Sequence, residues 1–234
     1  MLKFRFVDRG FKKTTVLLPG WATDCRIFDG LDLDYNYLLP AKFSLQSFPE
    51  DLSGQLDRLR LRKISLFGWS LGGFLAAEFA AAHPARVEEL FLLGICGRYG
   101  QETIAGAKDR LRQNRRAFLA KFYLSCFSKV DRAGLREFRR RLWRDYLREM
   151  RLEDLLQGLD YLAGAAVDTT LLRRIKKILI FHGGEDKIAP FREACRLKAR
   201  LPAAKLILLP ALGHLFFLNP QFKSLLDGQG YYRP

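Results

Sequence analysis

The sequence predicts an α/β fold: a mainly parallel central sheet flanked by helices, with an all-helical segment inserted into it. Apolar β-rich runs alternate with helix-spaced runs along the chain, which is typical of parallel sheets with helices on both faces. From about 101 to 166 the periodicity is helical and no strand pattern is visible. At 234 residues the chain fits one such domain. We therefore assign 1–100 and 167–234 to the core and 101–166 to a helical lid.

Short runs of apolar and β-branched residues predict the strands. Lys3 to Val7 alternates apolar and charged residues like a half-exposed edge strand, and Thr14 to Leu18 ends at Pro19-Gly20. Further strands are expected at Tyr35 to Leu39, Ile64 to Phe67, Val87 to Ile95, Ile178 to Phe181 and Lys205 to Leu209. Core helices are expected over Gln55 to Leu61, Leu71 to Ala82 and Phe191 to Arg200, and after Asn219-Pro220.

Composition excludes several classes of protein. Hydrophobic residues make up 49% and charged residues 28%, which favours a packed core over disorder. No apolar run is long enough to span a membrane, and the first residues lack a secretory signal, so we expect a cytoplasmic protein that binds no membrane. The four cysteines are far apart, and no histidine lies at metal-ligand spacing. We expect reduced thiols, no metal and no cofactor.

The positive charge is concentrated in one segment. The chain carries a net charge of +15, and Lys108 to Arg151 holds 15 Lys or Arg against 5 Asp or Glu, a net +10. Such local basicity predicts an acidic partner. Nucleic acid is not expected, because these residues lie in the lid rather than in a helix-turn-helix or an aromatic RNA-binding sheet.

Ser70 is the candidate nucleophile. Gly68-Trp69-Ser70-Leu71-Gly72-Gly73 contains G-x-S-x-G between an apolar strand and an apolar helix, the context of a nucleophile elbow. A strand that turns directly into a helix strains the backbone at the serine and leaves room only for glycine two residues away. The N–H of Leu71 could then stabilise an oxyanion. The alternative is a structural serine in a glycine-rich turn.

A serine nucleophile needs a histidine base and a carboxylate behind it. Among the three histidines, His83 ends a helix and His182 directly follows a strand, and we interpret both as structural. His214 lies in a loop after the last strand, from which it could reach the sheet edge, so we predict it as the base. Asp186 is the preferred carboxylate and Glu185 the alternative. The chain order serine, acid, histidine is that of α/β-hydrolases.

The second oxyanion donor should come from the loop after an earlier strand. Leu17-Leu18-Pro19-Gly20-Trp21 is such a loop, in which Gly20 permits the bend and the N–H of Trp21 can face that of Leu71. An ordinary Pro-Gly turn beside a core tryptophan is the alternative.

These motifs resemble the α/β-hydrolase family and, more narrowly, the pimeloyl-acyl-carrier-protein methyl ester esterases of biotin synthesis. The resemblance runs over most of the chain. Its carriers are Leu18-Pro19-Gly20-Trp21-Ala22, the elbow with Trp69 before Ser70, Gly183-Gly184-Glu185-Asp186-Lys187-Ile188-Ala189-Pro190, and Gly213-His214 followed by Asn219-Pro220. Two departures are Pro19, where many relatives have histidine, and a short region from Gly30 to Ser47.

The resemblance implies a mechanism and a partner. Ser70 would attack an ester carbonyl, Trp21 and Leu71 would hold the oxyanion, and water would hydrolyse the acyl-enzyme. The helical insertion would be a lid that docks an acidic acyl carrier protein.

The lid pattern allows that role. Leu135, Phe138, Leu142, Tyr146 and Met150 recur at steps of three and four residues and predict one buried helix face. On the opposite, solvent-facing side lie the candidate docking residues Arg136, Arg140, Arg144 and Arg148. A solubilising charged face is the alternative. Candidate substrate-binding residues are Trp21, Trp69, Phe118, Phe122 and Trp143, although a lid core would use such aromatic residues too.

Two rival functions remain open from the sequence. One is an esterase or thioesterase for free small molecules, with a solubilising basic lid. The other is a non-catalytic binding module on a hydrolase fold, which the ordered serine, acid and histidine disfavour. We expect a monomer.

Overall fold

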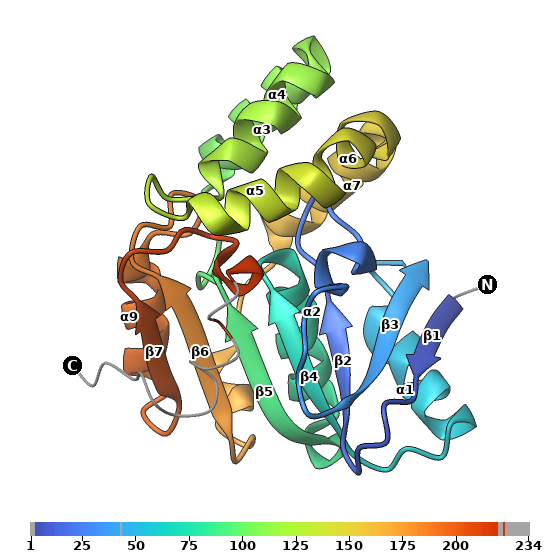
Figure 1. Cartoon of the computed structure of the whole chain (residues 1–234). Helices are drawn as coiled ribbons and strands as arrows, with labels where there is room; N and C mark the ends of the chain where they lie inside the picture. The colour runs from blue at the N-terminus through green and yellow to red at the C-terminus, as the bar shows by residue number, and fades with distance from the viewer. Residues whose placement is uncertain (1–2, 43, 220–221, 223–234) are drawn as a thin grey trace.

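A seven-stranded, mostly parallel sheet forms the centre of the computed structural model, which describes residues 3–42, 44–219 and 222 (Figure 1). Its strands lie in the order β1-β3-β2-β4-β5-β6-β7. Only β1 runs antiparallel to its neighbour, and the other pairs are parallel. The strands are β1 (Lys3–Val7), β2 (Thr14–Leu18), β3 (Asn36–Lys42), β4 (Ile64–Trp69), β5 (Val87–Leu93), β6 (Ile178–Gly183) and β7 (Lys205–Leu209). The predicted α/β sheet is confirmed.

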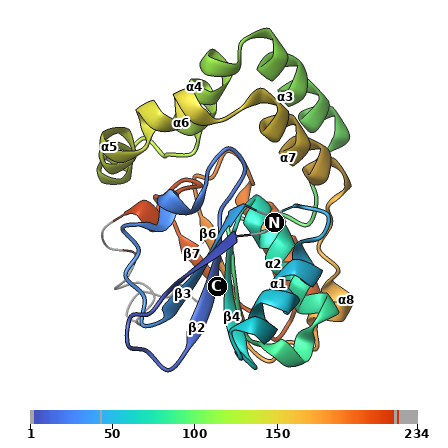
Figure 2. The same ribbon diagram turned by 90° about the vertical axis from the view of Figure 1, so that its right-hand side faces the viewer.

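Helices and short 3-10 turns cover the two faces of this sheet. Helices α1 (Phe48–Arg58) and α2 (Leu71–Ala82) lie on one face, while the 3-10 helices η1 (Cys25–Phe28) and η3 (Phe216–Leu218) lie on the other (Figure 2). A further 3-10 turn, η2 (Pro84–Arg86), joins α2 to β5, and α9 (Phe191–Arg200) packs on β6 and β7. Strands β2, β4 and β6 are buried throughout, as expected for parallel strands between two layers.

The predicted element boundaries differ from the structure at a few places. Helices α2 and α9 have the predicted limits, but α1 begins at Phe48, seven residues before the prediction. The first turn of α1 contains buried Phe48, and a proline follows it. Proline is common in the first turn of a helix, but the leucine spacing alone did not indicate that the helix begins here. Strand β6 continues to Gly183, so His182 lies inside the strand rather than after it. The helix predicted after Asn219-Pro220 lies outside the described residues.

A helical insertion between β5 and β6 lies above the carboxyl ends of the strands (Figure 1). Its helices are α3 (Gln101–Gln113), α4 (Arg115–Ser125), α5 (Arg132–Arg141), α6 (Trp143–Glu149) and α7 (Leu152–Gly164), followed by the short α8 (Thr169–Leu172). None of the described helices is both long and apolar enough to cross a membrane.

The single helix face predicted from Leu135 to Met150 is wrong in one respect. The helix breaks at Leu142, and α5 and α6 run in different directions (Figure 2). In an unbroken helix, Phe138 and Trp143 would point about 140° apart around the axis. The break instead lets their rings pack with centroids 6.2 Å apart. Tertiary packing of aromatic rings therefore overrides the helical period, although Phe138, Leu142 and Tyr146 are buried as predicted.

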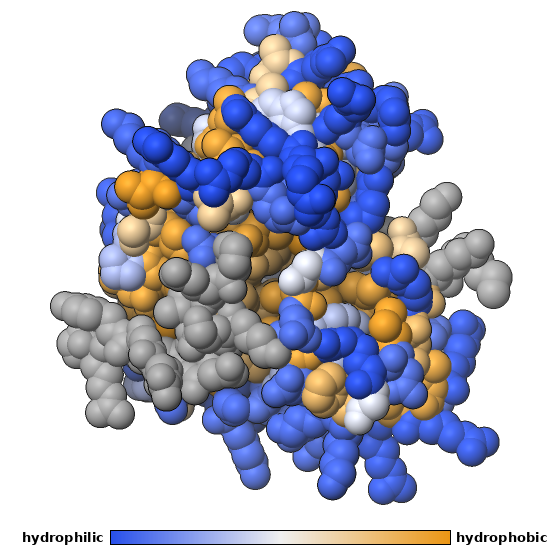
Figure 3. Space-filling model, viewed as in Figure 1, coloured by the Kyte–Doolittle hydropathy of each residue, from blue (hydrophilic) through white to orange (hydrophobic). Residues whose placement is uncertain are grey.

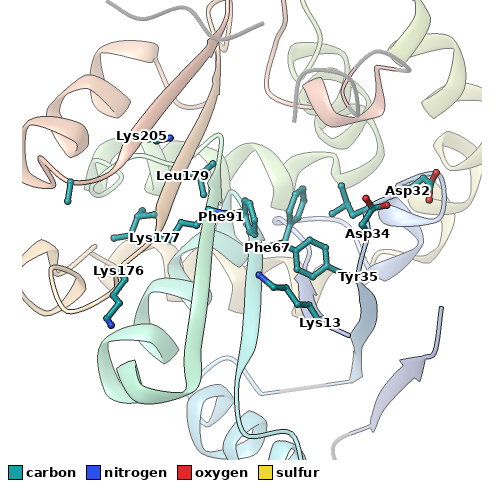
Figure 4. A pocket seen from close by; sticks show the side chains of 13 residues that line it. Lys13, Asp32, Asp34, Tyr35, Phe67, Phe91, Lys176, Lys177, Leu179 and Lys205 are labelled. Carbon is teal, nitrogen blue, oxygen red and sulfur yellow. The ribbon is translucent and has the colours of Figure 1, made fainter. Parts of the chain in front are cut away.

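A cavity of about 520 Å³ lies near the amino ends of the strands, at the end of the sheet opposite the lid (Figure 4). Beside it lies Glu89 of β5, which is only 4% exposed. Its carboxylate accepts hydrogen bonds from Lys177, Tyr35 and, at 3.3 Å, the hydroxyl of Ser65. Burial alone would raise the pKa of Glu89, but these hydrogen bonds and the charges of Lys177 and Lys13 lower it below its usual value.

We expect Glu89→Gln to lower the free energy of unfolding at pH 7 by about 1–3 kcal/mol, because a charged acceptor is lost from a buried cluster. A depressed pKa means that the stabilisation is present above the unfolded-state pKa and is lost as the pH falls. The difference between variant and wild type in urea denaturation should therefore shrink on acidification towards about pH 4. Exposed Glu88, which pairs with Lys13, is the matched control. A Glu88→Gln effect as large as that of Glu89→Gln would contradict the role of burial.

Candidate active site

Ser70 occupies a sharp turn between β4 and α2. Its backbone has φ 53° and ψ −117°, a left-handed conformation that costs energy for any residue with a side chain. The N–H of Ser70 donates to Leu93 O at 2.9 Å and ties the turn to β5. Its side chain does not cap α2, although it stands at the N-cap position. The hydroxyl is therefore not engaged in holding the helix end.

Glycines on either side of Ser70 allow this turn to form. A Cβ at Gly68 would lie 2.4 Å from Gly72 O, and one at Gly72 would lie 2.2 Å from Leu18 O. Both distances are shorter than non-bonded carbon–oxygen contacts in proteins, so a residue with a side chain would force the backbone apart. The G-x-S-x-G pattern thus reflects close approach of strand, turn and helix, as the sequence predicted.

His214 and Asp186 form a buried hydrogen-bonded pair. Nδ1 of His214 lies 2.7 Å from Oδ2 of Asp186, and the two residues are 0% and 6% exposed. The other carboxylate oxygen, Oδ1, accepts the N–H groups of Ile188 and Ala189 at 2.8 and 2.9 Å. A carboxylate can only accept, so Nδ1 carries the proton and Nε2 offers its lone pair. Among the described residues, nothing hydrogen-bonds to that buried Nε2.

Three contacts place His214 beside the serine turn. Its main-chain oxygen accepts the indole N–H of Trp69 at 3.0 Å, and the two rings are 5.2 Å apart. Its imidazole packs on Gly94, where a Cβ would lie 2.9 Å from Nδ1. Gly94 follows Leu93, the residue whose carbonyl accepts the N–H of Ser70. Trp69, the neighbour of Ser70, and Gly94, the neighbour of its hydrogen-bond acceptor, thus both contact His214 at the carboxyl edge of the sheet.

The loop after β2 lies against the elbow, as an oxyanion hole requires. Leu18 O and Pro19 O face Gly72, and Gly20 packs on the ring of Trp69. In the described part of the chain, no backbone hydrogen bond outside helices and strands uses the N–H of Trp21 or Leu71 as donor. Both N–H groups of the predicted pair are thus unused by the protein backbone, which suits donors kept for a developing negative charge.

The lid is hydrogen-bonded to the loop after β2. The indole N–H of Trp21 donates to Leu155 O in α7 at 2.8 Å, and Gly158 leaves room for the same ring. The hydroxyl of Tyr123 in α4 donates to Ala22 O at 2.6 Å. With these contacts in place Ser70 is only 4% exposed.

The lid also contacts the loop that carries His214. The N–H of Leu215 donates to Cys126 O at 3.0 Å, and the hydroxyl of Ser128 donates to Ala211 O at 2.6 Å. Gly213 lies against the same segment, with its Cβ position 2.6 Å from Cys126 O. The end of α4 thus helps to fix the position of the histidine loop.

The predicted substrate-binding aromatic residues fall into three groups. Phe118 and Phe122 pack edge-on against Trp21, with centroids 6.2 and 4.9 Å away, and these three remain candidates for an acyl-binding wall. Trp69 is 1% exposed and its indole N–H donates to His214 O, so its contacts help to position the histidine, while its role in substrate binding stays a prediction. Trp143 packs on Tyr123, Phe138 and Arg139, all within the lid, and we now interpret it as lid core.

The other candidates for base and acid are placed differently. His83 ends α2 and packs on Phe79. Glu185 is exposed, and its N–H donates to Leu212 O. His182 is buried close to Asp186. Of the two acids considered, Asp186 is the one that contacts His214.

Tyr99, which no sequence motif marks, lies close to the Ser70 side chain. Burial raises the pKa of its phenol well above the usual value, and the Cys96 thiol raises it further, while hydrogen bonding with the Ser70 side chain lowers it. Its ring packs on Phe74 of α2 with centroids 6.0 Å apart. The one sequence feature that could have indicated Tyr99 is its position in the loop after β5. Functional residues of parallel sheets often lie in such loops, at the carboxyl ends of the strands.

Residues 8–222 match the sequence profile described as the alpha/beta hydrolase family. The chain belongs to that family. The match covers both parts of the sheet and the helical insertion, so it agrees with the elbow and with the pairing of Asp186 and His214 at the carboxyl edge.

Named relatives of this hydrolase include more than one kind of enzyme. It is 29% identical to the pimeloyl-[acyl-carrier protein] methyl ester esterase of Nitrosomonas europaea, over 91% of this chain and 93% of the relative. It is also 29% identical to the 2-hydroxymuconate semialdehyde hydrolase of Pseudomonas putida, over 74% of this chain and 63% of that relative. The structure of an esterase from Exiguobacterium antarcticum superposes with a TM-score of 0.81 at 20% identity, over 97% and 93%. That structure supports the fold alone.

We expect Gly94→Ala to lower ester hydrolysis at least about 100-fold, because misplacing a catalytic group by an ångström costs that much. The added methyl group would lie 2.9 Å from His214 Nδ1 and 3.5 Å from Asp186 Oδ2. Steady-state hydrolysis of para-nitrophenyl butyrate measures the loss.

Gly10→Ala is the control for this substitution. Gly10 also has a positive φ, 79° against 54° at Gly94, but a Cβ there meets nothing within 4 Å. Both variants share the backbone cost, and only Gly94→Ala crowds the histidine. Equal activity of the two variants would contradict the placement of His214.

Proposed function

We propose that this hydrolase is a serine carboxylic-ester hydrolase that cleaves the methyl ester of pimeloyl-acyl carrier protein in biotin biosynthesis. Ser70 is the nucleophile, His214 the general base and Asp186 the carboxylate that orients it. The observation that carries the proposal is the buried hydrogen bond between His214 and Asp186, which leaves Nε2 unpartnered beside the serine turn.

The chemistry follows from these positions. Ser70 Oγ attacks the ester carbonyl as its proton passes to His214 Nε2, and Asp186 stabilises the resulting imidazolium. The N–H groups of Trp21 and Leu71 hold the oxyanion of the tetrahedral intermediate. The C–O bond to the methoxy group then breaks, and methanol leaves with the proton from His214. Water attacks the acyl-enzyme by the same route, which releases the acid and restores Ser70.

The substrate assignment is supported by the relative from Nitrosomonas europaea and by the charge of the lid. The relative acts, by its name, on an ester borne by acyl carrier protein. In this chain Arg136, Arg140, Arg144 and Arg148 are all exposed on α5 and α6. Hydrophilic side chains cover much of the lid in Figure 3. The break at Leu142 divides these arginines between two helices, so they are not one row along a single helix. Exposed cations on both helices would still attract and orient an acidic carrier.

The four arginines are not equally available. Arg140 pairs with Glu137 at 2.8 Å, and Arg148 pairs with Asp145 and Glu149. Arg136 and Arg144 form no ion pair within the described ranges. Since an intramolecular pair competes with a partner's carboxylate, Arg136 and Arg144 should contribute most to docking.

Two observations favour an alternative function. The arginines are partly neutralised by ion pairs, and one relative is named as a 2-hydroxymuconate semialdehyde hydrolase. In this alternative, the enzyme is an esterase or thioesterase for free small molecules and the basic lid aids solubility. The two proposals differ in whether a carrier improves the substrate, and kinetics can measure that.

We expect Arg136→Glu combined with Arg144→Glu to lower kcat/KM for the carrier-bound methyl ester about 10-fold, because two attractive contacts become repulsive. The value for the free methyl ester of pimelate should stay unchanged. Higher ionic strength should weaken the carrier advantage in wild type and remove it in the variant.

Arg58→Glu combined with Arg62→Glu is the control, since it changes the net charge equally at the end of the sheet away from the lid. Equal losses in the two double variants would show an effect of net charge alone. A wild-type enzyme that hydrolyses the free ester as well as the carrier-bound ester would establish the small-molecule alternative.

A further inference from the structure

His182 is a buried ionisable residue that the proposed mechanism does not use. It is the penultimate residue of β6 and is 0% exposed. Its Nε2 lies 2.6 Å from Ala189 O and 3.6 Å from Asp186 Oδ2. A carbonyl oxygen can only accept a hydrogen bond, so Nε2 carries the proton and donates it to Ala189.

We infer that His182 is a positioning residue for Asp186. By donating to Ala189 O, it fixes the turn from 183 to 190 so that one carboxylate oxygen of Asp186 faces His214. The inference rests on the proposed triad and adds to it a residue that touches neither substrate nor Ser70.

The Ala189 peptide shows how the turn is fixed. Its N–H donates to Asp186 Oδ1 at 2.9 Å, and its carbonyl accepts from His182. Ala189 is itself fully buried. Asp186 therefore holds the peptide group before Ala189 and His182 holds the one after it, and loss of the histidine would leave a buried carbonyl without this donor.

The first half of the turn is held differently. The N–H groups of Gly184 and Glu185 donate to Leu209 O and Leu212 O, at 2.9 and 3.0 Å. These bonds tie the turn to the loop before His214. Together with the bond from His182, they fix the backbone at both ends of the segment that carries Asp186. The carboxylate itself is held by the N–H groups of Ile188 and Ala189.

The surroundings of His182 keep it neutral. Burial lowers its pKa, and although Asp186 and Ala189 O favour the charged form, the pKa remains below its usual value, with His214 lowering it as well. The ring of Phe191 packs on its other side at 5.9 Å. In the described structure, its Nδ1 has no hydrogen-bond partner. A neutral His182 does not compete with the His214 imidazolium for the charge of Asp186.

Three variants at this position separate positioning from core filling. His182→Gln keeps an N–H donor at a similar reach, His182→Leu keeps the bulk without a donor, and His182→Asn keeps a polar amide too short to reach Ala189. Ile207→Ala is the control, because Ile207 is buried in β7 beside Phe181 and outside the turn. Thermal unfolding, kcat and KM would be measured with para-nitrophenyl butyrate, well below the melting temperature of each variant.

We expect His182→Leu and His182→Asn to lower kcat about 10- to 100-fold with KM within about twofold, as for a misplaced catalytic group. His182→Gln should recover most of kcat. The acidic limb of the kcat profile should move to lower pH in the Leu and Asn variants, because a weaker contact with Asp186 stabilises the His214 imidazolium less. Ile207→Ala should lose thermal stability but keep kcat and the pH profile.

Two results would overturn the inference alone: wild-type kcat in folded His182→Leu or His182→Asn, or a loss in His182→Gln as large as that in His182→Leu. Should His182→Leu not fold, the Gln and Asn pair decides. A wild-type enzyme no more active than Ser70→Ala would instead overturn the proposed function and this inference with it.

Discussion

The hydrogen bond between His214 and Asp186 is the interaction on which the rest of the site depends. It joins two loops 28 residues apart in the chain, each of which follows a strand of the parallel sheet. The bond requires both backbones to approach closely, and glycine makes this possible. A Cβ at Gly183 would lie 2.2 Å from Gly213 O, so the strand that leads to the acid and the loop that carries the histidine are in direct backbone contact.

The lid is part of this arrangement rather than a separate cover. Its α7 accepts a hydrogen bond from Trp21 in the loop after β2, and the end of α4 accepts one from Leu215 in the loop that carries His214. Movement of the lid to admit a substrate would therefore disturb both loops.

Much of the fold could be predicted because its signals are local. Gly68, Ser70 and Gly72 lie within five residues, and the strand, turn and helix that use them are contiguous. Ser70, Asp186 and His214 lie at or after the carboxyl ends of parallel strands. Such strands end at one edge of the sheet, so a common location could be predicted. The limits of α2 and α9 were predicted because apolar periodicity and flanking prolines or short turns coincide there.

The rest depends on tertiary contacts that the sequence does not display. The break at Leu142 arises from aromatic packing between Phe138 and Trp143, and no helix-breaking residue marks it. The hydrogen bond from the Trp69 indole to His214 O joins residues 145 positions apart, and no sequence pattern indicates it. The positions of Tyr99 and Gly94 near Ser70 depend on β5 lying between β4 and β6, and the sequence does not give that strand order.

The central claim is that Ser70 is a nucleophile activated by His214. The most direct measurement is intact-protein and peptide mass spectrometry after exposure to a fluorophosphonate, with Ser70→Ala and Asp186→Asn in parallel. We predict one adduct per chain, located on Ser70, absent in Ser70→Ala and formed far more slowly in Asp186→Asn. Failure of folded wild-type protein to form an adduct at Ser70, or an adduct rate unchanged in Asp186→Asn, would contradict it.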